Sequence, residues 1–323
     1  MAQPTNTFDT YDAVGNREDL SDKIYNVSPE KTPVVSAGVR NKANAKFFEW
    51  QRDTLASPNK DNAVIEGDER SGTALTATTR VGNYAQLFDK VAVVTTTQRA
   101  VKTAGRSEEM KYQIVMKAIP ELKRDVEAMV LSGNAAVAGN SATARKSGGL
   151  GVFLYTNALH NGAGATASHT SGAPTTAITA GTNRAFTETL LKTAMQSVFT
   201  NSGEMPSMVS LTPSHKATFS GFTGIAQNRR EAGRKQAVII GGADVYVSDF
   251  GELTIVPNYV QATAAANTVY ILNPEQYGVS VLQPYNTVPL AKTGHTDKEM
   301  VSVELGTWVG SEAAHAKIAD LTA

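Results

Sequence analysis

The sequence predicts an α+β fold built around one dominant helix, and three observations support this prediction. Residues 107–132 have the pattern of a single long amphipathic helix. The chain before this helix contains extended segments but no apolar core of its own. The last third of the chain consists mostly of short strand patterns separated by turns. A long helix joined to segments that cannot bury themselves predicts a subunit that neighbouring copies complete.

The arm that opens the chain is predicted to be polar and irregular over residues 1–45. Prolines interrupt it, and only a brief helix from Asp19 or Ser21 to Ile24 is expected before Ser28-Pro29. We therefore expect an arm here rather than a domain.

An extended hairpin is predicted to follow the arm. Residues 46–52 alternate so that Phe48 and Trp50 share one face of a strand, and residues 84–97 form a second extended run. The polar stretch between them, residues 54–82, is long for a loop inside a compact domain. A protruding hairpin or a lid accounts for it better.

The long helix has apolar residues at steps of three and four, which places them on one stripe. These residues are Ile114, Val115, Ala118, Ile119, Leu122, Val126, Met129 and Val130. Ser107 is the expected N-cap, and Gly133-Asn134 is the expected end. At a rise of about 1.5 Å per residue the helix would be about 40 Å long. Pro120 removes one backbone hydrogen bond and predicts a bend.

The chain after the long helix alternates between helix and strand patterns. We expect a strand at 150–155, a flexible surface loop at 157–182 and a second helix capped by Thr187. The expected buried face of the second helix consists of Leu190, Leu191, Ala194, Met195, Val198 and Phe199. A strand at 207–211, a helix from Thr212-Pro213, a hairpin around 249–251, strands at 269–272, 278–282 and 300–308, and a final run through Ile318 follow.

The composition excludes several classes of function. The 323 residues carry no net charge, so no general basic field attracts nucleic acid or an anionic membrane. The absence of cysteine excludes disulfides, thiolate chemistry and cysteine-bound metal centres. We expect neither a signal peptide nor a membrane span.

Motifs that carry catalytic or cofactor chemistry are not found. The five histidines show no metal-binding spacing and are expected to be ordinary surface or loop residues, and no GxSxG elbow supports a hydrolase. The glycine-rich stretch 147–151 matches no phosphate loop, so a tight turn is favoured. The acidic residues Asp61, Glu66, Asp68 and Glu69 lack EF-hand spacing and are expected on a solvated loop. We therefore expect no cofactor, no metal and no enzyme activity.

The densest basic cluster contains Arg229, Arg230 and Arg234 together with Lys235. A phosphate contact remains open, but no aromatic residues interleave to stack bases. A charged rim that meets a neighbouring subunit is the favoured role.

A set of local motifs occurs in a fixed order along the chain. They are residues 16–22 (NREDLSD), 48–55 (FEWQRDTL), 64–68 (VIEGD), 82–84 (GNY), 121–125 (ELKRD), 244–251 (DVYVSDFG), 290–294 (LAKTG) and 318–321 (IADL). Their order resembles the major capsid protein of tailed bacteriophages, the Hong Kong 97-type fold, and is closer still to a podovirus-type branch. The resemblance covers residue 16 to the C-terminus.

The resemblance implies an assignment of parts. The N-terminal arm would be residues 1–45 and the extended β-hairpin loop residues 46–98. Residues 99–184 and 285–323 would form the peripheral domain around the spine helix 107–132. Residues 185–284 would form the sheet-containing axial domain.

The resemblance also implies a function and partners. The chain would form hexamers and pentamers of an icosahedral shell that encloses double-stranded DNA without reading its sequence, with scaffold, portal and cement or decoration proteins as further partners. It would assemble in the host bacterial cytoplasm and reside in the virion. The residues expected at contacts between subunits are Phe48, Trp50, Lys60, Glu66, Asp68, Arg229, Arg230 and Arg234. Some relatives cross-link a loop lysine to an asparagine, for which Lys60 and Glu66 would be the candidates.

Two other classes of function stay open at the level of sequence. A minor head, tail or decoration protein would bind a preformed particle and stay monomeric or trimeric alone. A soluble hydrolase would need catalytic groups that only the fold brings together.

Overall fold

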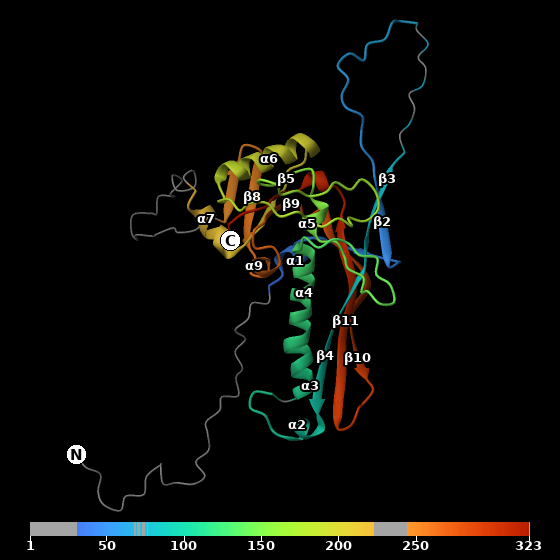
Figure 1. Ribbon diagram of the computed structural model, residues 1–323, viewed down its shortest axis with the longest axis vertical. Coiled ribbons are helices and arrows are strands. Elements are labelled where there is room, and N and C mark those ends of the chain that lie inside the picture. Colours follow the sequence, from blue (N-terminus) through green and yellow to red (C-terminus); the bar gives the residue numbers. More distant parts are fainter. Residues whose placement is uncertain are drawn as a thin grey trace, which may run out of the picture.

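The computed structural model describes residues 31–67, 69, 72, 75, 77–106, 108–222 and 244–322. Figure 1 shows an elongated body in which a vertical helix and a long sheet lie side by side, with a second block of sheet and helices near one end. The described helices are α1 (Pro33–Ala37), α2 (Thr96–Ala100), α3 (Glu109–Tyr112), the π-helical stretch η1 (Gln113–Ala118), α4 (Ile119–Leu131), α5 (Leu150–Phe153), α6 (Glu188–Ser202), α7 (Pro213–Ser220), α9 (Gln261–Ala264) and the 3₁₀ turn η2 (Glu312–Ala314).

The described strands form three sheets. They are β1 (Val39–Lys42), β2 (Phe47–Arg52), β3 (Thr79–Tyr84), β4 (Gln86–Thr95), β5 (Ala158–Leu159), β6 (Met208–Leu211), β7 (Val245–Ser248), β8 (Gly251–Pro257), β9 (Val269–Leu272), β10 (Tyr277–Leu290), β11 (Thr296–Val309) and β12 (Ala316–Ile318). The predicted strands at 207–211, 269–272, 278–282 and 300–308 and the hairpin of β7 and β8 are confirmed.

The predicted long helix is confirmed as a continuous helical run through α3, η1 and α4. A π-helical stretch precedes Pro120: the amide of Ile119 bonds to the carbonyl of Ile114, five residues back. The bend at Pro120 stays a prediction. Pro120 then occupies the first turn of α4, where its missing N–H costs little. Ser107, the expected N-cap, lies outside the described residues.

The end of the helix differs from the prediction. Ser132 ends α4 in an extended conformation, and its hydroxyl donates to the carbonyl of Met129 at 2.7 Å. Gly133 is not a left-handed cap; a Cβ there would lie 2.6 Å from Cδ1 of Ile178, so a larger residue would displace the end of that side chain. One residue of the predicted stripe, Val115, is exposed, because the π-helical stretch changes the angular phase of the helix there.

The long sheet has the strand order β1-β10-β11-β4 and packs on the spine formed by α3, η1 and α4. The strand predicted within 84–97 is β4, and it pairs along its length with β11. One face of this sheet contributes to the first hydrophobic core, which includes Leu122, Val126, Val301 and Val303.

A protruding hairpin is present, but its second strand is β3, most of which lies in the stretch 54–82 that was predicted as loop; the run at 84–97, predicted as that second strand, pairs with β11 instead. Strands β2 and β3 pair in antiparallel register from Phe47 opposite Tyr84 to Arg52 opposite Thr79. The chain between them projects beyond the rest of the described structure at the top of Figure 1.

The six-stranded sheet has the order β5-β12-β9-β6-β8-β7 and forms the second core with α6 and α7. Thr187 and Thr212 cap these two helices as predicted, and Gly203 ends α6 at a φ of 70°. Phe199, predicted on the buried face of α6, is exposed and contacts the ring of Phe250 instead.

Two predictions in the middle of the chain are wrong. Residues 150–155 begin with the helical turn α5 rather than a strand; all four residues of α5 are buried, so no periodicity distinguishes helix from strand. Residues 157–182 are not a simple surface loop, because β5 pairs with β12 and Ala165 pairs with Thr179.

Candidate assembly interface

The tip of the hairpin exposes large aliphatic side chains. Leu55 is 93 % exposed, Ile65 is 79 % exposed and Leu75 is 99 % exposed. Single exposed aliphatic residues are ordinary, but several on one projecting segment mark a contact surface. Lys60 and Glu66 lie exposed on the same segment, whereas Asp68 lies outside the described residues.

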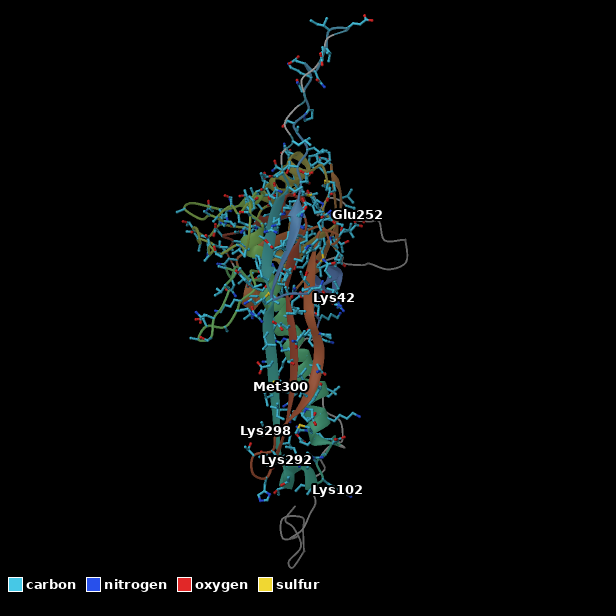
Figure 2. All side chains as sticks on the ribbon, turned by 90° about the vertical axis from the view of Figure 1, so that its right-hand side faces the viewer. Lys42, Lys102, Glu252, Lys292, Lys298 and Met300 are labelled. Atoms are coloured by element: carbon cyan, nitrogen blue, oxygen red, sulfur yellow. The ribbon has the colours of Figure 1, made fainter. Side chains whose placement is uncertain are left out.

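The long sheet has a second exposed apolar surface on the face away from the spine helix. Leu87, Val91 and Val93 alternate along β4 and point outward, while Lys90 between them reaches Asp125 on the spine at 3.1 Å. The register continues this face across the sheet, since Val91 lies opposite Met300 and Met300 lies opposite Val288. Figure 2 views this side, where Met300 and Lys298 mark the long strands. We call Leu87, Val91, Val93, Val288, Lys298 and Met300 the outer sheet face.

Phe48 and Trp50 lie at the root of the hairpin, the paired strands β2 and β3, and pack it against other residues of the same subunit. The Trp50 ring lies 6.0 Å from the Phe153 ring and 6.2 Å from the Trp308 ring, and Phe48 lies 6.1 Å from Trp50. Arg52 donates from Nε to the carbonyl of Gly310 at 3.0 Å. Burial lowers the pKa of Arg52. The shared face predicted for Phe48 and Trp50 is confirmed, and it points into the subunit.

The end of the arm is fixed by a buried carboxylate on the spine. Glu127 of α4 is fully buried, and its oxygens accept the amides of Val34 at 2.9 Å and Val35 at 2.8 Å, in the first turn of α1. Asn258 donates to the same carboxylate at 2.7 Å from the chain after β8. Burial raises the pKa of Glu127. One side chain therefore joins the arm, the spine helix and the segment next to the second sheet.

A second buried polar group, Asn83, fixes the glycine-rich stretch 147–151. Its Nδ2 donates to the carbonyls of Gly148 and Thr307, and its Oδ1 accepts the amide of Gly148 at 2.9 Å. A Cβ at Gly149 would lie 2.2 Å from the carbonyl of Ser132. The glycines therefore allow close backbone approach to the end of the spine helix.

Three of the five histidines are buried, so the expectation of surface positions is wrong for them; His169 and His315 do lie in loops, as expected, whereas His215 lies in α7. His169, His215 and His315 are each at most 9 % exposed. Burial lowers the pKa of His169 and of His315 to about 4. His169 lies edge-on to Phe153 and Tyr155. Histidine has no fixed preference for surface or core, so its burial carried no signal in the sequence.

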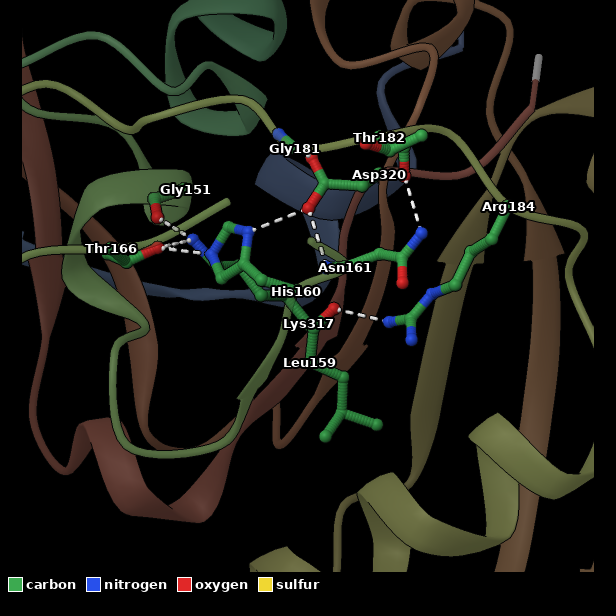
Figure 3. Close-up of polar contacts among 10 residues, drawn as sticks. All are labelled: Gly151, Leu159, His160, Asn161, Thr166, Gly181, Thr182, Arg184, Lys317 and Asp320. Atoms are coloured by element: carbon green, nitrogen blue, oxygen red, sulfur yellow. Dashed lines mark hydrogen bonds and ion pairs between the residues drawn. The ribbon is translucent and has the colours of Figure 1, made fainter. Parts of the chain in front are cut away.

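Figure 3 shows a chain of polar contacts that links the side chains of Asp320, His160, Thr166 and Lys317. Asp320 lies 3.0 Å from Nδ1 of His160, and Nε2 of His160 lies 2.8 Å from the hydroxyl of Thr166. Lys317 of β12, 1 % exposed, donates to Thr166 and to the carbonyl of Gly151 at 2.5 Å. Burial lowers the pKa of Lys317 to about 7 and also lowers the pKa of His160.

Lys317 is expected to make the stability of the subunit depend on pH. Its folded pKa lies below the ordinary value of 10.5, so the unfolded chain binds more protons between pH 7 and 10.5. The free energy of unfolding therefore rises with pH in this window. Urea unfolding of unassembled wild-type and Lys317→Met subunits should show the wild type gaining about 2 kcal/mol relative to the variant from pH 7 to 9. Parallel pH profiles would contradict this assignment.

The remaining predicted sites stay untested. Arg229, Arg230 and Arg234 lie outside the described residues. Within the described part of the chain, no group of three or more histidine, aspartate or glutamate side chains is arranged to hold a metal ion. No helix there is long and apolar enough to cross a membrane.

Comparisons of sequence and of structure match this chain to known proteins along nearly its whole length. The family model described as SU10 major capsid protein matches residues 3–322. The major capsid protein of Escherichia phage Phieco32 is 28 % identical over 95 % of this chain and 94 % of its own length. A solved chain of Gordonia phage Cozz has a TM-score of 0.62 at 9 % identity, with coverage of 99 % of this chain and 97 % of that one. The capsid structure of cyanophage P-SCSP1u gives 0.58 at 11 % identity, with coverage of 95 % and 93 %.

These matches decide between the classes of function that the sequence left open. The implied α+β fold of Hong Kong 97 type is confirmed, and neither a decoration protein nor a hydrolase agrees with a capsid family matched along nearly the whole chain. The podovirus-type branch stays a prediction. The chain belongs to the SU10 major capsid protein family: it is a structural, non-enzymatic component of the virion that forms the icosahedral phage shell with copies of itself.

Proposed function

We propose that the chain forms hexamers and pentamers by laying its β2–β3 hairpin over the outer sheet face of a neighbouring copy. The observation that supports this proposal is the exposure of Leu55, Ile65 and Leu75 on a segment that projects away from its own chain. The outer sheet face offers exposed apolar side chains, next to the charged Asp89 and Lys298, that its own chain leaves uncovered.

The two surfaces occupy different parts of one subunit, so the contact is heterologous and each copy both gives and receives a hairpin. A head-to-tail contact of this kind closes into a ring when the rotation between copies closes. Burial of one such aliphatic side chain stabilises a contact by about 1.5–3 kcal/mol. Modest contacts repeated around a ring and across a shell give a stable particle without one very tight interface.

The predicted contact residues have different roles in this arrangement. Phe48 and Trp50 hold the hairpin root from within the subunit. Lys60, Glu66 and Asp68 belong to the segment that reaches the neighbour, and Arg229, Arg230 and Arg234 form a charged rim between copies. The shell encloses double-stranded DNA, and its neutral net charge lets DNA move along the wall without adhering. Scaffold, portal and cement proteins are further partners.

Cross-linking in assembled shells tests this arrangement, because the chain has no cysteine of its own. The double variant Ile65→Cys with Val91→Cys places one thiol on the hairpin and one on the outer sheet face. A bismaleimide reagent is expected to join neighbouring copies into a ladder of up to six chains on a denaturing gel.

The matched control pairs Ile65→Cys with Lys192→Cys, whose side chain is exposed on α6 beside the other sheet. This control is expected to give no ladder. Shells of normal appearance in which both pairs stay uncross-linked would contradict the proposed contact.

A further inference from the structure

A single carboxylate holds both ends of the loop formed by residues 160–182. Oδ2 of Asp320 accepts the amide of Asn161 at 3.0 Å, and Oδ1 accepts the amide of Gly181 at 2.8 Å (Figure 3). A Cβ at Gly164 or Gly181 would lie within 2.7 Å of the Asp320 carboxylate. Asp320 itself has a φ of 59°, a left-handed conformation that aspartate adopts more readily than most residues. The chain is therefore shaped around this carboxylate.

The middle of the loop is fixed to the body of the subunit. Ala165 and Thr179 pair through two backbone hydrogen bonds, which close the loop above Asp320. The amine of Lys317 donates a hydrogen bond to the hydroxyl of Thr166, and the ring of His169 lies edge-on to the rings of Phe153 and Tyr155. These contacts give the loop a defined path away from the second sheet.

The far tip of the loop bonds to the edge of the hairpin. The amide of Gly82 in β3 donates to the carbonyl of Gly172 at 2.8 Å, and the amide of Gly172 donates to the carbonyl of Arg80 at 2.9 Å. Gly172 has a φ of 68°, which favours glycine at this tip. The loop thus adds a short parallel bridge to β3 at the root of the projecting hairpin.

We propose that residues 160–182 act as a strap that sets the angle of the β2–β3 hairpin, with Asp320 as the positioning residue. The strap runs from the carboxylate near the C-terminus to the root of the hairpin and back. Loss of the carboxylate removes its bonds to both ends of the strap and leaves the bonds between Asn161 and Thr182 to hold these ends, so the bridge between Gly172 and β3 then opens more often. The effect on shell geometry rests on the proposed function, whereas the effect on the hairpin root does not.

Hydrogen exchange of unassembled subunits tests the strap without depending on assembly. The variant Asp320→Gly removes the carboxylate and keeps a residue that tolerates the left-handed φ. The amide of Gly82 is expected to exchange at least about tenfold faster, since loss of its hydrogen bond exposes it on local opening. Amides of the spine helix, such as that of Val126, should exchange as in the wild type. Asp320→Asn keeps one acceptor oxygen and can therefore hold only one end of the strap, so it should restore only part of the protection.

A second variant acts at the other end of the strap. Gly172→Pro removes the amide that bonds to Arg80 and also excludes the φ of 68° at the tip, so it should accelerate exchange at Gly82 while the bonds of Asp320 remain. Shells of either variant are expected to have a broader distribution of diameters. Wild-type protection of Gly82 in both variants, or equal acceleration at Gly82 and in the spine helix, would overturn the strap. Faster exchange at Gly82 with shells of unchanged diameter would instead contradict the link to assembly.

Discussion

Replacing Val91 and Val93 together by glutamate is expected to abolish shell formation while the subunit stays folded. Both side chains point outward from β4 and are about half exposed, so the free subunit accommodates the charges in water. In a shell the same positions would lie under the hairpin of the neighbour. Burying an unpaired carboxylate costs several kcal/mol, and the variant buries two, which offsets the contribution of about 1.5–3 kcal/mol from each buried aliphatic side chain of the hairpin.

Sedimentation velocity and negative-stain electron microscopy of the purified variant measure this effect. The variant should sediment as a single chain of about 34 kDa at concentrations where the wild type forms rings or shells. The pair Val91→Thr and Val93→Thr keeps shape and strand preference and should still assemble. Normal shells from the glutamate variant would show that this face is not an interface.

Replacing Glu127 by leucine is expected to destabilise the subunit more than any exposed substitution. The change leaves the amides of Val34 and Val35 and the side chain of Asn258 without their acceptor in the interior. Each buried donor left unpaired costs about 1–3 kcal/mol, so we expect a loss of about 4 kcal/mol. Such a loss is a large share of the roughly 5–15 kcal/mol that stabilises a typical domain.

Urea unfolding of unassembled subunits gives this number directly. Glu127→Gln keeps one acceptor oxygen and should lose less than half as much. Glu121→Leu on the exposed side of the same helix should change stability by less than about 1 kcal/mol, because its pair with Lys90 is exposed. An equal decrease in the free energy of unfolding for Glu127→Leu and Glu121→Leu would contradict the assignment of a stabilising role to the buried carboxylate.

The elements in which apolar residues recur at a regular spacing were predictable from the sequence. The spine helix, the α6 helix and strand β2 follow patterns that local chemistry fixes, such as the cap at Thr187 and the alternation of Phe48 and Trp50. Strand β3 was missed, because most of it lies in the polar stretch 54–82 that was predicted as loop. The predictions of local structure were wrong where tertiary packing, rather than the local sequence pattern, determines the conformation or the burial of a residue. The run at 150–155 is buried on all sides, and Val115 left the buried stripe because the π-helical stretch before Pro120 shifts the helix phase.

The candidate interface was predictable only in part. An arm and a loop that cannot bury themselves pointed to assembly, and the order of motifs pointed to the family. The sequence did not predict the outer sheet face, because the register of β4 with β11 must be known before the valines of β4 can be assigned to one exposed surface. Glu127 carried a weak signal, a charge flanked by Val126, Met129 and Val130 on the apolar stripe. Nothing in the sequence indicated that Asp320 would hold a loop from residues 160–182.

The proposed contact between copies is tested most directly by a three-dimensional reconstruction of the assembled shell by electron cryomicroscopy, at a resolution that traces the hairpin. We expect the segment between β2 and β3 of each copy to lie over β4, β11 and β10 of the next copy and to cover Val91, Val93 and Met300. A closed shell in which this face is bare, or is covered by another part of the neighbour while the hairpin lies elsewhere, would contradict it.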